Sequence, residues 1–246
     1  GSQINSSITT SVKAISEGTL KYTEIKATWQ DPTTKTYYAL AALDKTAVQA
    51  LYEKEIVESE DYIANCLFKT DDPLIRFAKL CQAIDKHNAT QNALVYYNAL
   101  AGESGSFLRP AFSMQELKAM RAETAKEIPI KILVVGDESA YLETALRNVI
   151  RQLGFSENGI SENTEYELSA TLETDPQKTI GKQIYQPLRI NISLKKGDNL
   201  LFSYVDKTEQ GGPTIEEANS RSIKVLAKNI ENKFNKEFTQ YLLSIE

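Results

Sequence analysis

The segment from Thr28 to Asp44 constrains the fold of this 246-residue chain more than any other. It holds the only tryptophan, Trp29, at the end of a strand-like run. The next residues, Asp31 to Lys35, are typical of a turn, because proline fixes φ and aspartate accepts a local backbone hydrogen bond. A second strand is expected from Thr36 to Leu43, and Asp44 is placed to cap a helix. The segment therefore predicts a β-hairpin that leads directly into a helix.

The residues before this hairpin give a weaker signal. Leu20 and Tyr22 share one strand face, whereas Ile25, Ala27 and Trp29 share the other. This change of phase indicates a bulge near Thr23-Glu24. Residues 3–17 fit both a helical stripe and a strand composition, so both alternatives stay open for them.

A long antiparallel helical hairpin is predicted over residues 45–101. An apolar stripe with helical spacing continues to about Lys69, and Asp72-Pro73 then supplies a cap and a first helical residue. A short connection implies that the two helices pack against each other. In this register Cys66 lies level with Phe77 rather than with Cys81, which argues against a disulfide and favours buried packing for both cysteines.

The second half of the chain follows a different pattern. Ser113 begins a capping-box helix that ends near Lys126, and Glu127-Ile128-Pro129 marks the expected domain boundary. The order after it is β-α-β-β-β-α, a two-layer unit with both helices on one side of the sheet. We expect residues 206–212, with two adjacent glycines, to form a flexible connector. The prediction is an α+β protein with two domains, residues 1–128 and 129–246.

Composition excludes some classes of protein. With 41% hydrophobic residues the chain can bury a core, and its net charge of −5 with scattered basic residues argues against a nucleic-acid partner. No apolar run reaches the roughly 20 residues of a membrane helix. Because Gly1-Ser2 resembles a cloning remnant, we expect that a signal peptide and a lipid-bearing cysteine could precede it. Any membrane contact is then expected through such an anchor.

Candidate chemistry is sparse in this sequence. Gly136-Asp137 follows a buried strand as in a phosphate-binding turn, but one glycine is too few and a structural turn is expected. The single histidine, His87, has polar neighbours and is expected to be solvated. Acidic clusters such as Glu216-Glu217 are typical of helix first turns. We therefore predict no enzyme activity and no catalytic, cofactor or metal site.

Aromatic residues offer the remaining candidates for a functional surface. Tyrosines lie beside the turn and near the end of the helical hairpin, without interleaved basic residues. Packing is the expected use of most of these rings, and a ring left exposed could serve a protein contact. The possible interaction surface comprises Trp29, Tyr37 and Tyr97.

The hairpin segment resembles the signature of the LPP-twenty-type bacterial lipoprotein family. The residues that carry the resemblance are Trp29, Asp31-Pro32, Tyr38-Ala39-Leu40-Ala41 and Leu43-Asp44. The second half also looks like the small accessory domains of flagellar or peptidoglycan-associated lipoproteins, at the level of fold. The resemblance implies a secreted, lipid-anchored envelope protein without known catalysis.

Two functions are compatible with this resemblance. The leading hypothesis is a non-enzymatic interaction or assembly module of the bacterial cell envelope, periplasmic or anchored at the outer membrane, whose partners are other envelope proteins. The alternative is a protein that binds a small ligand or a peptidoglycan fragment in a cleft between its two halves.

Overall fold

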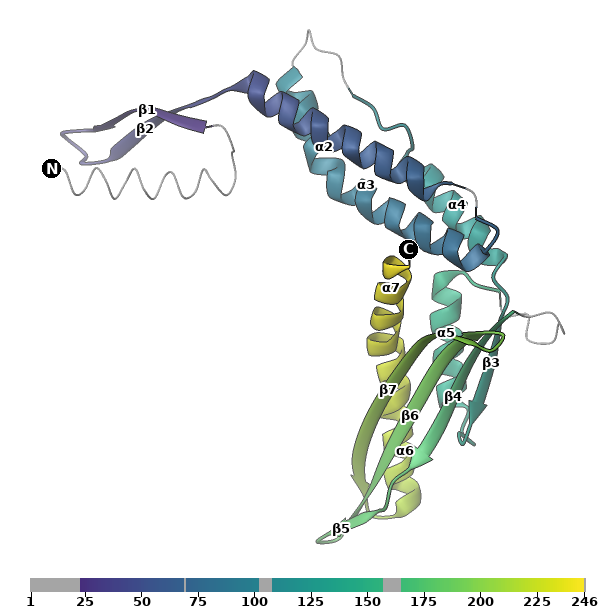
Figure 1. Cartoon of the computed structure of the whole chain (residues 1–246). Helices are drawn as coiled ribbons and strands as arrows, with labels where there is room; N and C mark the ends of the chain where they lie inside the picture. The colour runs from purple at the N-terminus through teal and green to yellow at the C-terminus, as the bar shows by residue number, and fades with distance from the viewer. Residues whose placement is uncertain (1–22, 69, 102–107, 157–164, 246) are drawn as a thin grey trace. The chain divides into compact units, whose positions relative to one another are not determined.

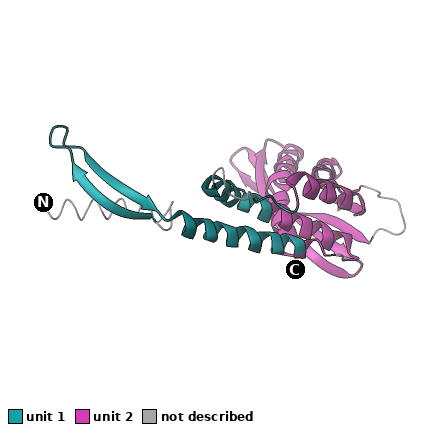
Figure 2. Ribbon diagram, turned by 90° about the horizontal axis from the view of Figure 1, so that it is seen from above, with its two compact units in different colours: residues 1–64, 86–111 teal, residues 65–85, 112–246 magenta. Residues whose placement is uncertain are grey.

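The structure is a computed structural model that describes residues 23–68, 70–101, 108–156 and 165–245. The chain has an α+β fold (Figure 1), and it forms two compact units (Figure 2). The first unit comprises residues 1–64 and 86–111, and the second comprises residues 65–85 and 112–246. The expected domain boundary between residues 128 and 129 stays a prediction. The expectations for residues 3–17 and for Leu20 and Tyr22 lie outside the described residues.

The first unit begins with the predicted β-hairpin. Strands β1 (Thr23–Gln30) and β2 (Tyr37–Leu43) pair antiparallel, with a register shift between Ile25 and Ala27. The bulge therefore lies two residues later than the sequence predicts. Asp44 then caps helix α2 (Lys45–Cys66), because its carboxylate accepts a hydrogen bond from the Ala47 backbone over 3.1 Å.

The predicted helical hairpin is also present. Helix α2 is followed by α3 (Pro73–Ala101), and the two run side by side in Figure 1. Asp72 caps α3 through hydrogen bonds from the backbones of Leu74 and Ile75, as the sequence predicts. In the first unit the two helices bury Ile56 against Ala93 and Tyr97.

The second unit contains helix α4 (Met114–Lys126) and a five-stranded sheet. Ser113 forms the predicted capping box at the start of α4. Strands β3 (Ile130–Val135) and β4 (Tyr166–Thr174) pair parallel, and β4 pairs antiparallel with β6 (Gln183–Lys196). Strands β5 (Lys178–Ile180) and β7 (Asn199–Gly212) both pair antiparallel with β6.

The helices of the second unit cover one face of this sheet, as predicted. Helix α5 (Tyr141–Leu153) and the final helix, α6 (Ile215–Asn229) with its continuation, bury their apolar stripes against it. The start of α3 joins the same core, where the rings of Phe77 and Phe155 meet edge to face at 4.7 Å. The opposite face carries polar and charged residues such as Glu173 and Arg189.

The last helix contains a π-helical turn, η1 (Ile230–Phe234), between α6 and α7 (Asn235–Ser244). Its buried residues recur at every fourth position: Ala218, Ser222, Leu226, Ile230, Phe234, Phe238 and Leu242. A spacing of four drifts around an α-helix of 3.6 residues per turn, and a π turn accommodates an extra residue. The π turn therefore keeps this stripe directed at the sheet.

Strand β7 corrects one prediction. Residues 206–212, expected as a flexible connector, continue the strand to Gly212. The two glycines permit close packing instead: a Cβ atom at Gly211 would lie 2.8 Å from the Gln183 side chain, and one at Gly212 would lie 2.7 Å from the Ala218 backbone. Glycine is needed at these two positions because neighbouring atoms approach the β7 backbone too closely to leave room for a side chain.

Candidate functional site

One face of the β1–β2 hairpin is apolar. In the observed register Trp29 lies opposite Tyr38, and Ala27 lies opposite Leu40. We call these four residues the apolar hairpin face. The rings of Trp29 and Tyr38 stack at 5.3 Å with an angle of 13° between their planes. This pair therefore forms one flat aromatic surface with a leucine beside it.

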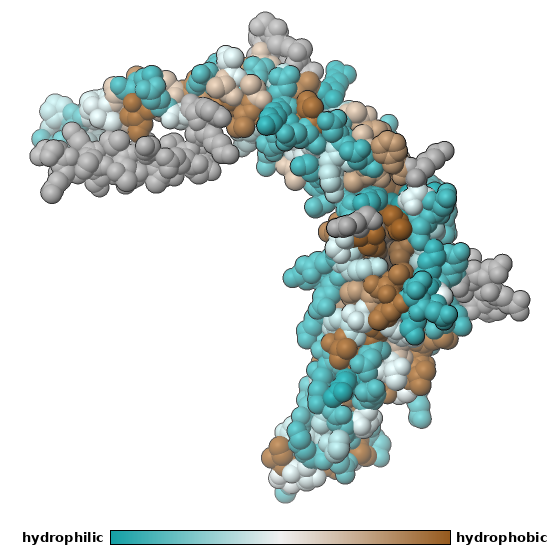
Figure 3. Space-filling model, in the orientation of Figure 1, coloured by the Kyte–Doolittle hydropathy of each residue, from teal (hydrophilic) through white to brown (hydrophobic). Residues whose placement is uncertain are grey.

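The apolar hairpin face is open to solvent. The exposed fractions of Trp29, Tyr38 and Leu40 are 53%, 43% and 55%. Figure 3 shows hydrophobic residues (brown) between hydrophilic ones along the hairpin. Alternating strands normally bury their apolar face, and an isolated two-stranded hairpin is marginally stable in water. The exposed apolar residues of the hairpin are therefore of the kind that a sheet normally buries against another apolar surface.

The turn that joins the two strands is well specified. The carboxylate of Asp31 accepts hydrogen bonds from the backbones of Thr33 and Thr34, at 2.7 and 3.2 Å. These bonds lower the pKa of Asp31. The side-chain amide of Gln30 donates to the Lys35 carbonyl over 3.0 Å, and Lys35 adopts φ of 59°. The predicted turn is confirmed, and it fixes the register of the strands.

The structure separates the three aromatic residues of the predicted interaction surface. Trp29 lies on the apolar hairpin face. Tyr37 pairs with Gln30, next to the Trp29–Tyr38 pair, so it lies on the opposite face of the hairpin, where it is 40% exposed. Tyr97 is only 5% exposed because it packs against Ile56 and Ala93. Tyr38 and Leu40, two positions apart in the second strand, join Trp29 instead. The second strand consists of Tyr, Ala and Leu throughout, so its sequence does not show which of these residues share the face of Trp29.

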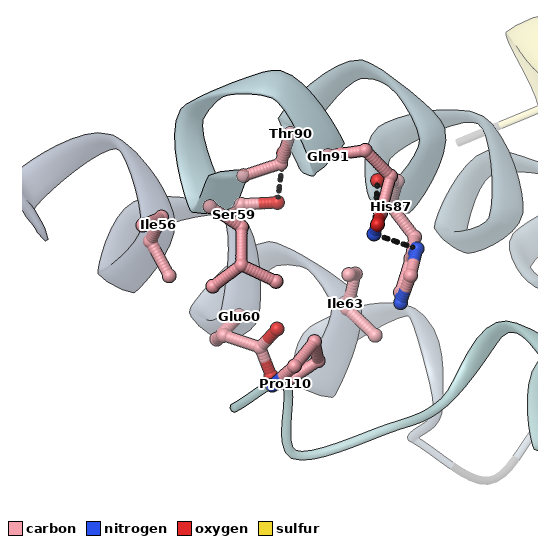
Figure 4. Close-up of a pocket in the computed structure, with 9 residues that line it drawn as sticks. Ile56, Ser59, Glu60, Ile63, His87, Thr90, Gln91 and Pro110 are labelled. Carbon is pink, nitrogen blue, oxygen red and sulfur yellow. Dashed lines mark hydrogen bonds between the residues drawn. The ribbon is translucent and has the colours of Figure 1, made fainter. Parts of the chain in front are cut away.

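A small polar pocket lies in the helical hairpin (Figure 4). The hydroxyl groups of Ser59 and Thr90 share a hydrogen bond of 2.7 Å, and both residues are buried. The amide nitrogen of Gln91 lies 2.9 Å from Nδ1 of His87. The cavity holds about 10 Å³, which suits a water molecule at most. The pocket is therefore too small for an organic ligand.

His87 corrects a second prediction, because it is 5% exposed rather than solvated. Its polar sequence neighbours gave a misleading signal. The helical spacing from Ile84 through His87 to Thr90 places it on the buried face of α3. Side-chain polarity alone does not show which face of a helix a residue occupies.

A larger apolar groove lies in the second unit. It has a volume of about 450 Å³, which falls in the usual range for ligand pockets. The end of α2, the start of α3 and helix α4 line it with Cys66, Leu67, Arg76, Leu80, Ala119, Met120, Glu123, Thr124 and Glu127. No pattern in the sequence brings these three segments together, because their contact depends on tertiary packing.

The Gly136-Asp137 turn is structural, as predicted. The carboxylate of Asp137 accepts hydrogen bonds from the backbones of Ser139 and Leu142, at 3.0 and 2.7 Å. Gly136 has φ of 90°, and a Cβ atom there would lie 2.8 Å from the Leu172 carbonyl oxygen. The turn thus packs against β4 and caps the start of α5.

Within residues 23–68, 70–101, 108–156 and 165–245, no group of three or more histidine, cysteine, aspartate or glutamate side chains is arranged to hold a metal ion. Over the same residues no helix has the length and apolar content needed to cross a membrane.

No protein-family model and no curated protein matches the chain. Among solved structures, a minor lipoprotein from Acinetobacter baumannii is similar with 15% identity and a TM-score of 0.33, covering 46% of this chain and 96% of its own. A Caulobacter crescentus CB15 protein assigned as a lipoprotein has 9% identity and a TM-score of 0.34, covering 51% and 97%.

Proposed function

We propose that this protein is a non-enzymatic interaction module of the bacterial cell envelope that binds another envelope protein through its apolar hairpin face. The observation that carries the proposal is the stacked pair of Trp29 and Tyr38 beside Leu40, all more than 40% exposed on the hairpin. Tryptophan and tyrosine dominate the binding energy of protein interfaces, because they bury a large rigid area.

The edges of the hairpin add to this proposal. In the described part of the chain, β1 pairs with β2 in a two-stranded sheet. Each strand therefore presents an outer edge of backbone groups to which a partner strand could add. A partner that supplies a strand and an apolar surface would complete the small sheet.

The envelope location rests on the sequence. The resemblance of the Trp29 to Asp44 segment to the LPP-twenty-type lipoprotein signature supports membership of that family. We infer a periplasmic protein, anchored at the outer membrane if a lipid-bearing cysteine precedes the segment. Fractionation of cells that express the natural gene tests this inference, and recovery in the cytoplasmic fraction would contradict it.

Photo-crosslinking in the bacterium that makes the protein tests the binding surface. A benzoyl-phenylalanine at position 40 replaces a residue of the apolar hairpin face, and the matched control at position 39 replaces an exposed residue of the opposite face in the same strand. We expect a discrete adduct from position 40 only. Equal yields from both positions, or none from either, would contradict the proposal.

A further inference from the structure

The sheet of the second unit ends in a long strand with an open edge. In the described part of the chain, β7 pairs with β6 alone, and it borders the sheet in Figure 1. Strands β4 and β5 pair along the other edge of β6. The outer edge of β7 therefore presents backbone groups to which another strand can add.

The backbone groups of Glu209, Lys207 and Val205 point to this open edge. Glu209 lies opposite Pro187 of β6. Pro187 has no N–H group, and its carbonyl accepts a hydrogen bond of 3.1 Å from Asp175, on the side away from β7. Glu209 is thus at a position without hydrogen bonds to β6, and the alternation of an antiparallel pair gives Lys207 and Val205 the same orientation. These three residues are exposed on the open face of the sheet.

The charges of this segment favour a second copy of the same strand. When two copies of one strand pair antiparallel about a two-fold axis, the residue at the axis decides which residues lie opposite each other. Registers centred on Asp206, Lys207 or Glu209 place like charges directly opposite, which is destabilising. The register centred on Thr208 instead places Lys207 of each copy opposite Glu209 of the other.

The ion pairs already present on this face are compatible with that register. They are balanced in sign: Lys178 with Glu209, Lys207 with Asp175, and Arg189 with Glu173. The Lys207 side chain is 52% exposed, so it can contact a second carboxylate. Pairing extends the ion pairs into a network in which opposite charges alternate. Exposed pairs contribute little energy, so they determine the register, while the backbone hydrogen bonds supply the affinity.

The same register covers an exposed valine. Val205 is 62% exposed, and it lies opposite Gly211 of the second copy. The ring of Tyr185 fills the space beside this glycine, because a Cβ atom at Gly211 would lie 2.9 Å from it. Val205 therefore meets an aromatic ring, which is a favourable cross-strand contact. Arg221 donates a hydrogen bond of 2.8 Å to the Gly211 carbonyl, so the paired segment ends there.

We propose that the protein forms a symmetric dimer in which two copies of β7 pair antiparallel through residues 205–211, with Thr208 at the two-fold axis. The two five-stranded sheets then form one continuous sheet. A strand of unrelated sequence would also satisfy the backbone groups, but the arrangement of Lys207 and Glu209 does not select it. The dimer is separate from the apolar hairpin face and does not depend on it.

Sedimentation of the full chain over a range of concentrations tests the proposal. We expect the mass to rise reversibly from 27.5 kDa to twice that value. Lys207→Glu and Glu209→Lys each place like charges opposite at both symmetric contacts, so each variant alone should associate about tenfold more weakly or less. An equimolar mixture of the two variants should dimerise, because both contacts then join opposite charges.

Two results of this experiment would overturn the proposal. One is a single-chain mass up to about 0.1 mM, where a dimer of micromolar affinity would be nearly complete. The other is a mixture of the two variants that associates no better than each variant alone.

Cysteine variants locate the axis. Thr208→Cys places two thiols opposite each other and should give a covalent dimer on mild oxidation. Ser203→Cys, an exposed position of the same strand, lies far from its copy and should not. The unsubstituted chain measures any background from Cys66 and Cys81. Equal crosslinking of both variants, or loss of the dimer in Leu40→Glu on the apolar hairpin face, would overturn the assignment.

Discussion

The hydroxyl group of Tyr166 donates a hydrogen bond of 2.7 Å to the carboxylate of Asp72, across 94 positions of sequence. The second carboxylate oxygen of Asp72 accepts a hydrogen bond from Lys196, also at 2.7 Å. Because Asp72 is the cap of α3 as well, one side chain joins the start of that helix to strands β4 and β6. A single carboxylate thus links the helix start to two strands of the sheet, in addition to the apolar packing of Phe77.

Substitutions at this carboxylate should destabilise the second unit. Asp72→Ala should lower the free energy of unfolding by about 2–3 kcal/mol, because it removes a helix cap and leaves the Tyr166 hydroxyl without its acceptor. Asp72→Asn should cost less, since asparagine also caps helices. Tyr166→Phe should cost about 1 kcal/mol. Urea unfolding of the single and double variants measures the coupling, and strictly additive losses would contradict a direct interaction.

Stability should fall in acid. Burial raises the pKa of Asp72, but hydrogen bonds from Lys196, Tyr166 and the Ile75 backbone outweigh burial and hold its pKa below the ordinary 3.8. A carboxyl group whose pKa is lower in the folded state stabilises the protein above its unfolded pKa, and this stabilisation is lost as pH falls through the folded pKa. Urea midpoints should therefore decrease below about pH 4. A flatter profile is expected for Asp72→Asn, and an unchanged profile would contradict this origin.

Two glycines with positive φ should respond differently to alanine. Gly136→Ala places a Cβ atom 2.8 Å from the Leu172 carbonyl oxygen, so strain and a clash are combined. Gly197→Ala has φ of 56° and no atom within 4 Å of the added Cβ, so only the backbone conformation is unfavourable. We expect a loss of about 1 kcal/mol at Gly197 and a clearly larger loss at Gly136, by thermal unfolding. Equal losses would show that β4 moves away from the turn.

The buried hydroxyl pair of the helical hairpin should behave as a unit. Ser59→Ala and Thr90→Val each remove one partner of the 2.7 Å hydrogen bond, and each should cost about 1 kcal/mol. The double variant should cost less than the sum, because replacing both partners leaves neither group unsatisfied. Denaturant unfolding followed by far-ultraviolet circular dichroism measures the helices directly. A double variant that loses the full sum would contradict a shared bond.

The single tryptophan provides a test of the hairpin surface. Because Trp29 is 53% exposed, its fluorescence should resemble that of tryptophan in water and should be quenched readily by acrylamide. When a partner covers the apolar hairpin face, the emission should shift to the blue and quenching should decrease. A protected, blue-shifted emission from the protein alone would contradict an open face.

Much of the architecture was predictable, because the signals are local. Pro73 after Asp72, the capping box from Ser113 and the turn at Asp31 each specify their own element through bonds within a few residues. The alternation of apolar residues likewise placed strands β4 and β6. The short strand β5 and the extension of β7 were missed, since polar residues at a sheet edge resemble a loop in sequence.

The candidate sites were less predictable. The sequence identified Trp29 as notable, but only the register of β1 and β2 shows that Tyr38 stacks on it and that Leu40 adjoins them. The groove around Arg76 and Met120 gave no sequence signal, because three segments far apart in the chain line it.

The sequence by itself therefore determined most of the helices and strands, the caps at Asp44, Asp72 and Ser113, and the hairpin turn, because the hydrogen bonds of these features close within a few residues. The tertiary structure decided which side chains are buried and which are open. His87 and Tyr97 are in the core, Trp29 is exposed, and Asp72 binds Tyr166 from 94 positions away. Burial depends on what packs against a residue, and long-range packing leaves no periodic signal in the chain.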